Sequence, residues 1–102
     1  MNKAKLDEMV DEATVDCYNA SEQVTGLYTM IEEHLSFPFE TSVLGASVTV
    51  TGVDLSDDDR IVAICVRGGV RQRISLLDLP LPTRVPKGAE WIKAYRHWAR
   101  NS

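Results

Sequence analysis

Residues 61–76 read IVAICVRGGVRQRISL, and this stretch decides the fold. Residues 61–66 form a nearly continuous apolar run rich in β-branched side chains, which is typical of a buried strand. Gly68-Gly69 follows as a two-residue turn, because glycine readily adopts the positive φ angles that such hairpins require. Residues 70–76 return as a second strand. The stretch therefore predicts a β-hairpin within a small antiparallel sheet.

Another strand precedes this hairpin. Residues 48–53 alternate valine with threonine, both of which favour strands. The segment DLSDDD at residues 54–59 lies between the two apolar strands and must reverse the chain. Further upstream, Pro38 ends any preceding helix, because proline restricts the residue before it to extended conformations.

Three amphipathic helices surround this sheet in the sequence. Apolar residues at helical spacing define the buried face of each predicted helix. The first face contains Leu6, Met9, Val10, Ala13 and Cys17; the second contains Val24, Leu27, Tyr28, Ile31 and Leu35; the third contains Trp91, Ile92, Tyr95, Trp98 and Ala99. Ser21 is the expected N-cap of the second helix.

The resulting prediction is a single α+β domain over residues 1–102, with two N-terminal helices, a small antiparallel sheet and a closing C-terminal helix. A chain of 102 residues can bury a core without disulfides or metal. Cys17 and Cys65 are expected as small core residues. No apolar run reaches membrane-spanning length and the N-terminus lacks a secretory signal, so we expect a cytoplasmic protein.

Charge is divided unevenly along the chain. Residues 1–59 carry 13 acidic and 2 basic side chains, whereas residues 60–102 carry 2 acidic and 9 basic ones. Such a division favours ion pairs between the two halves, and we expect Arg71 and Arg73 to take part in them. The net charge of −4 argues against a general nucleic-acid-binding function.

The acidic segment is the main candidate site. Asp57 and Asp59 project to the same side of an extended segment, about 7 Å apart at Cα. Oxygen ligands without nearby histidine or cysteine favour a hard cation such as Ca²⁺. The predicted ligands are Asp57, Asp58, Asp59 and Asp54, completed by Glu40 and Glu33, with Glu32 as a further remote donor.

This segment is not an EF-hand. Alignment from Asp54 places Asp59 where that loop needs glycine and Cys65 where it needs a bidentate glutamate. An acidic loop that only keeps the sheet edge soluble remains the alternative. No nucleophile elbow, P-loop, HExxH or dinucleotide fingerprint is present, so we do not expect an enzyme.

Several segments together resemble a known family. They are the residues EATVD (12–16), SEQV (21–24), PFE (38–40), VLG (43–45), LLDLPLP (76–82), GAEWI (88–92) and AYR (94–96). They resemble the small bacterial calcium-binding proteins of the CcbP type. The resemblance implies an α+β fold with a barrel-like sheet, and Ca²⁺ bound by surface carboxylates in a cytoplasmic buffer or sensor.

A protein-interaction module without metal is the competing hypothesis. Its partner would bind either the Arg71/Arg73 face or the Leu79-Pro80-Leu81-Pro82 edge. The aromatic residues of a single-strand-binding platform are absent around these arginines, so nucleic acid is not an expected partner. No membrane partner is expected either.

Overall fold

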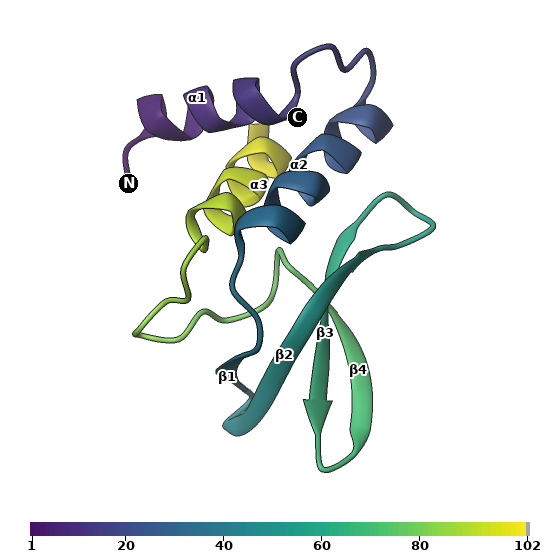
Figure 1. Cartoon of the computed structure of the whole chain (residues 1–102), viewed down its shortest axis with the longest axis vertical. Coiled ribbons are helices and arrows are strands. Elements are labelled where there is room, and N and C mark those ends of the chain that lie inside the picture. The colour runs from purple at the N-terminus through teal and green to yellow at the C-terminus, as the bar shows by residue number, and fades with distance from the viewer. Residues whose placement is uncertain (102) are drawn as a thin grey trace.

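Three helices gather at one end of the molecule and a four-stranded sheet occupies the other (Figure 1). The computed structural model describes residues 1–101. The elements in chain order are α1 (Lys3–Ala13), α2 (Ala20–His34), β1 (Phe39–Val43), β2 (Ala46–Leu55), β3 (Ile61–Arg67), β4 (Val70–Ser75) and α3 (Glu90–Asn101). None of the helices in residues 1–101 combines the length and apolar character that a membrane crossing requires.

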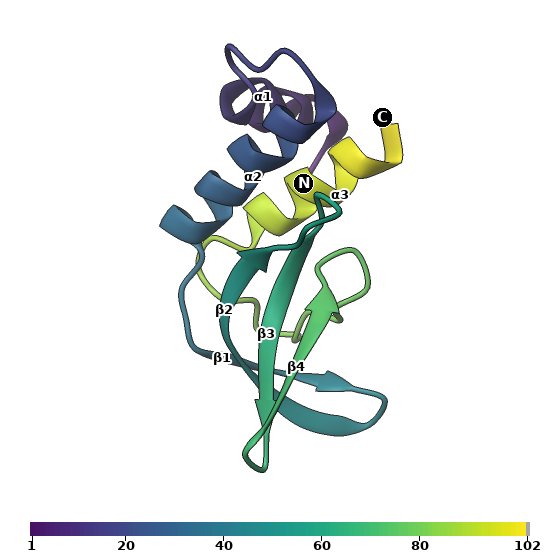
Figure 2. The same cartoon turned by 90° about the vertical axis from the view of Figure 1, so that its right-hand side faces the viewer.

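The sheet is antiparallel throughout, with strand order β1-β2-β3-β4 (Figure 2). This confirms the α+β prediction and the hairpin around Gly68-Gly69, where Arg67 pairs with Val70. The sheet is open, however, because β1 and β4 do not pair. The barrel-like closure expected from the resemblance is therefore absent in residues 1–101.

The connector at residues 79–82 is anchored to the core of this fold through Leu79. Leu79 is buried, and the Thr41 hydroxyl on β1 donates a hydrogen bond of 2.5 Å to the carbonyl of Pro80. The Arg96 guanidinium on α3 donates to the carbonyls of Leu76 and Leu79. These contacts hold Leu79 and the carbonyl of Pro80 inside the molecule, whereas Pro80 is exposed and Leu81 and Pro82 are half-buried, so part of the predicted partner edge stays accessible.

The core lies between the inner face of the sheet and the helices. Leu27 and Ile31 of α2, Ile61 of β3 and Tyr95 of α3 are completely or almost completely buried. The Tyr95 hydroxyl also accepts a hydrogen bond of 3.3 Å from the backbone N–H of Ile61, which ties α3 to the start of β3. Cys65 is buried at 2% exposure, which confirms its predicted place in the core.

Two details of the helical region differ from the predictions. The N-cap of α2 is Asn19, whose side chain accepts a hydrogen bond of 2.9 Å from Glu22 N–H, and not Ser21. Helix α1 ends at Ala13, so Cys17 lies in the turn between the helices. Its thiol instead donates to the Glu22 carbonyl at 3.4 Å, a local bond that the helical spacing of Cys17 does not reveal.

Candidate metal site

The acidic segment forms a tight, exposed turn between β2 and β3. Ser56 N–H donates to the Arg60 carbonyl at 2.8 Å, and Asp59 N–H donates to the Ser56 carbonyl at 3.1 Å. Asp59 has a φ of 59°, a left-handed conformation that aspartate tolerates better than most residues. Asp57, Asp58 and Asp59 are all exposed at this turn, so a solvated cation can reach them.

Asp58 has two partners within the turn. The Ser56 hydroxyl donates to its carboxylate, and the Arg60 Nε lies 3.3 Å from its other oxygen. The hydrogen bond from Ser56, aided by the charge of Arg60, lowers the pKa of Asp58 below its ordinary value of 3.8. The carboxylate is thus charged at neutral pH. Asp57 and Asp59 have no side-chain hydrogen bond or ion pair among residues 1–101.

Asp54 lies at the base of the turn, on the outer face of β2. Its carboxylate accepts from the guanidinium of Arg73 on β4 and, through its other oxygen, from the backbone N–H of Leu55 at 2.8 Å. The pair confirms the expected ion pair between the two halves of the chain for Arg73, but Arg71 has no acidic partner within residues 1–101. A cation that bound Asp54 would compete with Arg73.

Helix α2 places a further carboxylate near Asp54. The Tyr28 hydroxyl donates to Glu32 at 2.9 Å. Burial raises the pKa of Tyr28, and the hydrogen bond to Glu32 and the negative charges of Glu32 and Asp54 raise it further. Tyr28, Glu32 and Asp54 therefore share one region, at the side of α2 that faces β2. The i,i+4 spacing of Tyr28 and Glu32 was the available signal for this cluster.

Glu33 points away from this region. Ile31, two residues earlier in α2, is completely buried. Two residues correspond to a rotation of about 200° around the helix axis, so Glu33 lies nearly opposite Ile31. The Glu33 side chain is exposed on the face of α2 opposite the core. Glu33 is thus not brought to the acidic turn.

Glu40 is also distant from the turn. It pairs with Thr49 on β2, whereas the acidic turn begins after Leu55 at the end of that strand. Six residues of extended chain span roughly 20 Å. The structure therefore places Asp54 and Asp57–Asp59 along the same β2–β3 connection, and leaves Glu33 and Glu40 elsewhere.

The donor set at the turn suits Ca²⁺ in its chemistry. Every side-chain donor is an oxygen, and the turn adds the Ser56 hydroxyl and backbone carbonyls. Within residues 1–101, however, no three His, Cys, Asp or Glu side chains are gathered as a metal site. The residues fit the ion by type and charge, and their side chains would have to close around it.

Comparison with known proteins assigns the chain to a family. The family model of CcbP proteins, described as calcium binding, matches residues 7–99. No curated protein matches the chain. The crystal structure of CcbP from Anabaena is similar over 97% of this chain and 92% of that chain, with a TM-score of 0.77 and 18% sequence identity. The structural similarity supports the fold, and the family match covers nearly the whole sequence: the chain belongs to the CcbP family of calcium-binding proteins.

Proposed function

We propose that this protein binds Ca²⁺ at the turn between β2 and β3, through Asp57, Asp58 and Asp59, with Asp54 at its base. The observation that carries the proposal is the exposure of three consecutive carboxylates at a hairpin turn. Within residues 1–101, Arg60 is the one basic residue that forms an ion pair with any of the three. Like charges so close repel one another, and a divalent cation between them removes that repulsion.

Ca²⁺ requires six to eight oxygen ligands in a flexible arrangement. Four carboxylates, the Ser56 hydroxyl, backbone carbonyls and water supply that number. Glu32 of α2 is the additional candidate, since it lies on the Asp54 side of the helix. Glu33 and Glu40, although they were predicted as ligands, lie outside this proposed shell.

The position of the turn favours a calcium buffer over a sensor. The turn is exposed and joins two strands that remain paired up to Leu55 and Ile61. Closure of its side chains on an ion moves no packed helix. In ¹⁵N-labelled protein, we expect calcium to shift the amide resonances of residues 54–60 and to leave those of α1 and α3 in place. Widespread shifts in the helices would instead support a sensor.

Thermal unfolding tests whether the protein binds calcium selectively. Chelator-stripped protein is melted with calcium, with magnesium and with neither ion. If the dissociation constant is about 10 μM, 1 mM calcium adds about 2.7 kcal/mol to the free energy of unfolding. For a domain of this size the melting temperature rises by on the order of 10 °C. An equal rise with magnesium, or no rise, would contradict the proposal.

A further inference from the structure

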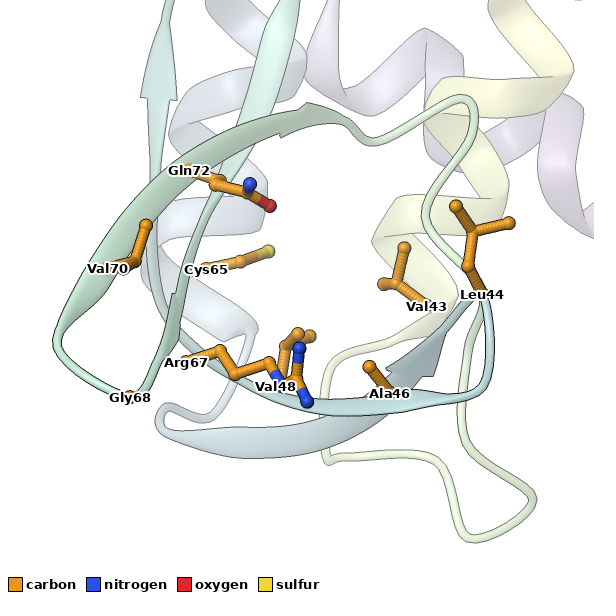
Figure 3. A pocket seen from close by; sticks show the side chains of 9 residues that line it. All are labelled: Val43, Leu44, Ala46, Val48, Cys65, Arg67, Gly68, Val70 and Gln72. Carbon is orange, nitrogen blue, oxygen red and sulfur yellow. The ribbon is translucent and has the colours of Figure 1, made fainter.

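A cleft of about 720 Å³, lined by apolar side chains together with Arg67 and Gln72, opens on the inner face of the sheet, at the end away from the helices (Figure 3). It lies between the tips of the β1–β2 and β3–β4 hairpins, whose strands β2 and β3 are paired with each other. The Cys65 and Gln72 side chains point into it from one side, and Val43 lies on the other. Leu44 is completely exposed at one hairpin tip, and Val70 is 60% exposed beside the other. The cleft is thus a space of mixed character, with apolar side chains beside Arg67 and Gln72, that the open sheet leaves between its two edges.

Strand β4 forms one border of this cleft and is the last strand of the sheet. Arg67 and Val70 flank the two-residue turn, so they form a hydrogen-bonded pair, and so do Cys65 and Gln72. The backbone groups of Arg71 and Arg73 therefore face away from β3. No other backbone hydrogen bond reaches these two residues within the described chain. The edge offers free donors and acceptors to an added strand.

The charge along this edge has a single sign. Arg71 and Arg73 lie on the outer face of β4, beside Ile64 and Asp54. Arg73 shares its charge with Asp54, whereas Arg67 and Arg71 have no acidic partner in residues 1–101. Strand β4 itself carries no carboxylate. Like-charged side chains protect an edge from association with itself, and they favour an acidic partner.

We propose that the β4 edge binds an extended acidic peptide segment of another protein as an additional strand. Alternate side chains of an added strand point to opposite faces. Those facing inward would enter the cleft beside Val70 and Gln72, and those facing outward would meet Arg71 and Arg73. Addition of a strand at a free sheet edge is a common mode of peptide recognition. A second copy of this chain, paired through the same edge, would instead oppose arginine to arginine.

A defined peptide tests this proposal independently of calcium. The probe is the blocked peptide Ser-Glu-Val-Glu-Val-Glu-Ser, added to ¹⁵N-labelled protein in the presence of chelator. We expect the amides of Arg71 and Arg73 to shift and to exchange more slowly with solvent. The amides of Val70 and Gln72, already bonded to β3, should keep their exchange rates. This alternation identifies strand addition and not a general electrostatic association.

Two controls test whether binding depends on the negative charge of the peptide and on the position of the arginine in the protein. The same peptide with lysine in place of glutamate should not bind. Arg71→Glu should weaken binding of the glutamate peptide at least tenfold, whereas Arg100→Glu, on the exposed end of α3, should leave it within twofold. Equal binding of the lysine peptide, shifts centred away from β4, unchanged affinity in Arg71→Glu, or no shift at 1 mM peptide would each overturn the proposal.

Discussion

Arg73 on β4 reaches across β3 to the carboxylate of Asp54 on β2. The two side chains remain 58% and 40% exposed, so the pair contributes little to the stability of the fold. Its importance lies in its place at the base of the acidic turn. Arg73 occupies an oxygen that the proposed calcium site would use, and so acts as an internal competitor for the ion.

Removal of this competitor is expected to strengthen calcium binding. Arg73→Gln should raise the calcium affinity a few-fold, because the Asp54 carboxylate no longer has to exchange one cation for another. The matched control is Lys93→Gln, which removes the same charge from the exposed face of α3. Calorimetric titration of both variants measures the effect. If both variants gain affinity equally, long-range charge and not the Asp54 pair is responsible.

The Tyr28 hydroxyl is expected to report on the ion. Negative charge on Glu32 and Asp54 contributes to the raised pKa of Tyr28, after burial. Calcium bound near these carboxylates should therefore lower that pKa part of the way towards its ordinary value. Absorbance at 295 nm, titrated with and without calcium in a Tyr18→Phe background and again with Tyr28→Phe added to it, separates the ionisation of Tyr28 from that of Tyr95. An unchanged titration would place the ion away from Asp54 and Glu32.

Close packing between α1 and α2 depends on Gly26. A Cβ at this position would lie 2.2 Å from the carbonyl oxygen of Ala13, at the end of α1. Gly26→Ala should therefore lower the free energy of unfolding by about 1–3 kcal/mol, as overpacking does elsewhere. Gly52→Ala is the control, because its Cβ would enter open space. Urea denaturation compares the two, and equal losses would show that helix packing is not the cause.

A histidine–carboxylate pair joins α1 to α3. The His97 Nε2 lies 2.7 Å from Asp7 Oδ1, and this hydrogen bond, with help from Lys3, lowers the pKa of Asp7 below its ordinary value of 3.8. A lowered carboxyl pKa stabilises the fold above the ordinary value and loses that effect as the pH falls through the lowered one. The stability difference between the wild type and Asp7→Asn should thus be present at pH 6 and decline below pH 3.8. Asp11→Asn, on the exposed face of the same helix, should show no such difference at either pH.

Local patterns predicted the elements of this fold well. The apolar spacing of the helices and the Gly68-Gly69 turn depend on interactions between near neighbours, which the sequence displays directly. The β1–β2 hairpin was missed, because its turn holds Leu44 at a φ of 51°, a conformation that leucine rarely adopts. Only Gly45 beside it is a typical turn residue.

The candidate site was less predictable, because its parts come from separate elements. Helical spacing shows that Glu32 and Glu33 lie on different sides of α2. Which of the two lies near Asp54 can be told only when the side of α2 that faces β2 is known. The distance between Glu40 and the turn depends on strand register, which places Glu40 opposite Thr49. The aspartates of the turn, contiguous in sequence, are the part that local reasoning could group together.

Calorimetric titration of calcium into two matched triple variants tests the central claim most directly. In the first variant, Asp57, Asp58 and Asp59 are each changed to asparagine. In the second, Glu8→Gln, Asp11→Asn and Glu12→Gln remove the same charge from the exposed face of α1. We expect the calcium affinity of the first variant to fall at least a hundredfold and that of the second to stay within threefold of the wild-type affinity. Unchanged affinity in the first variant would contradict the assignment of calcium to the turn between β2 and β3.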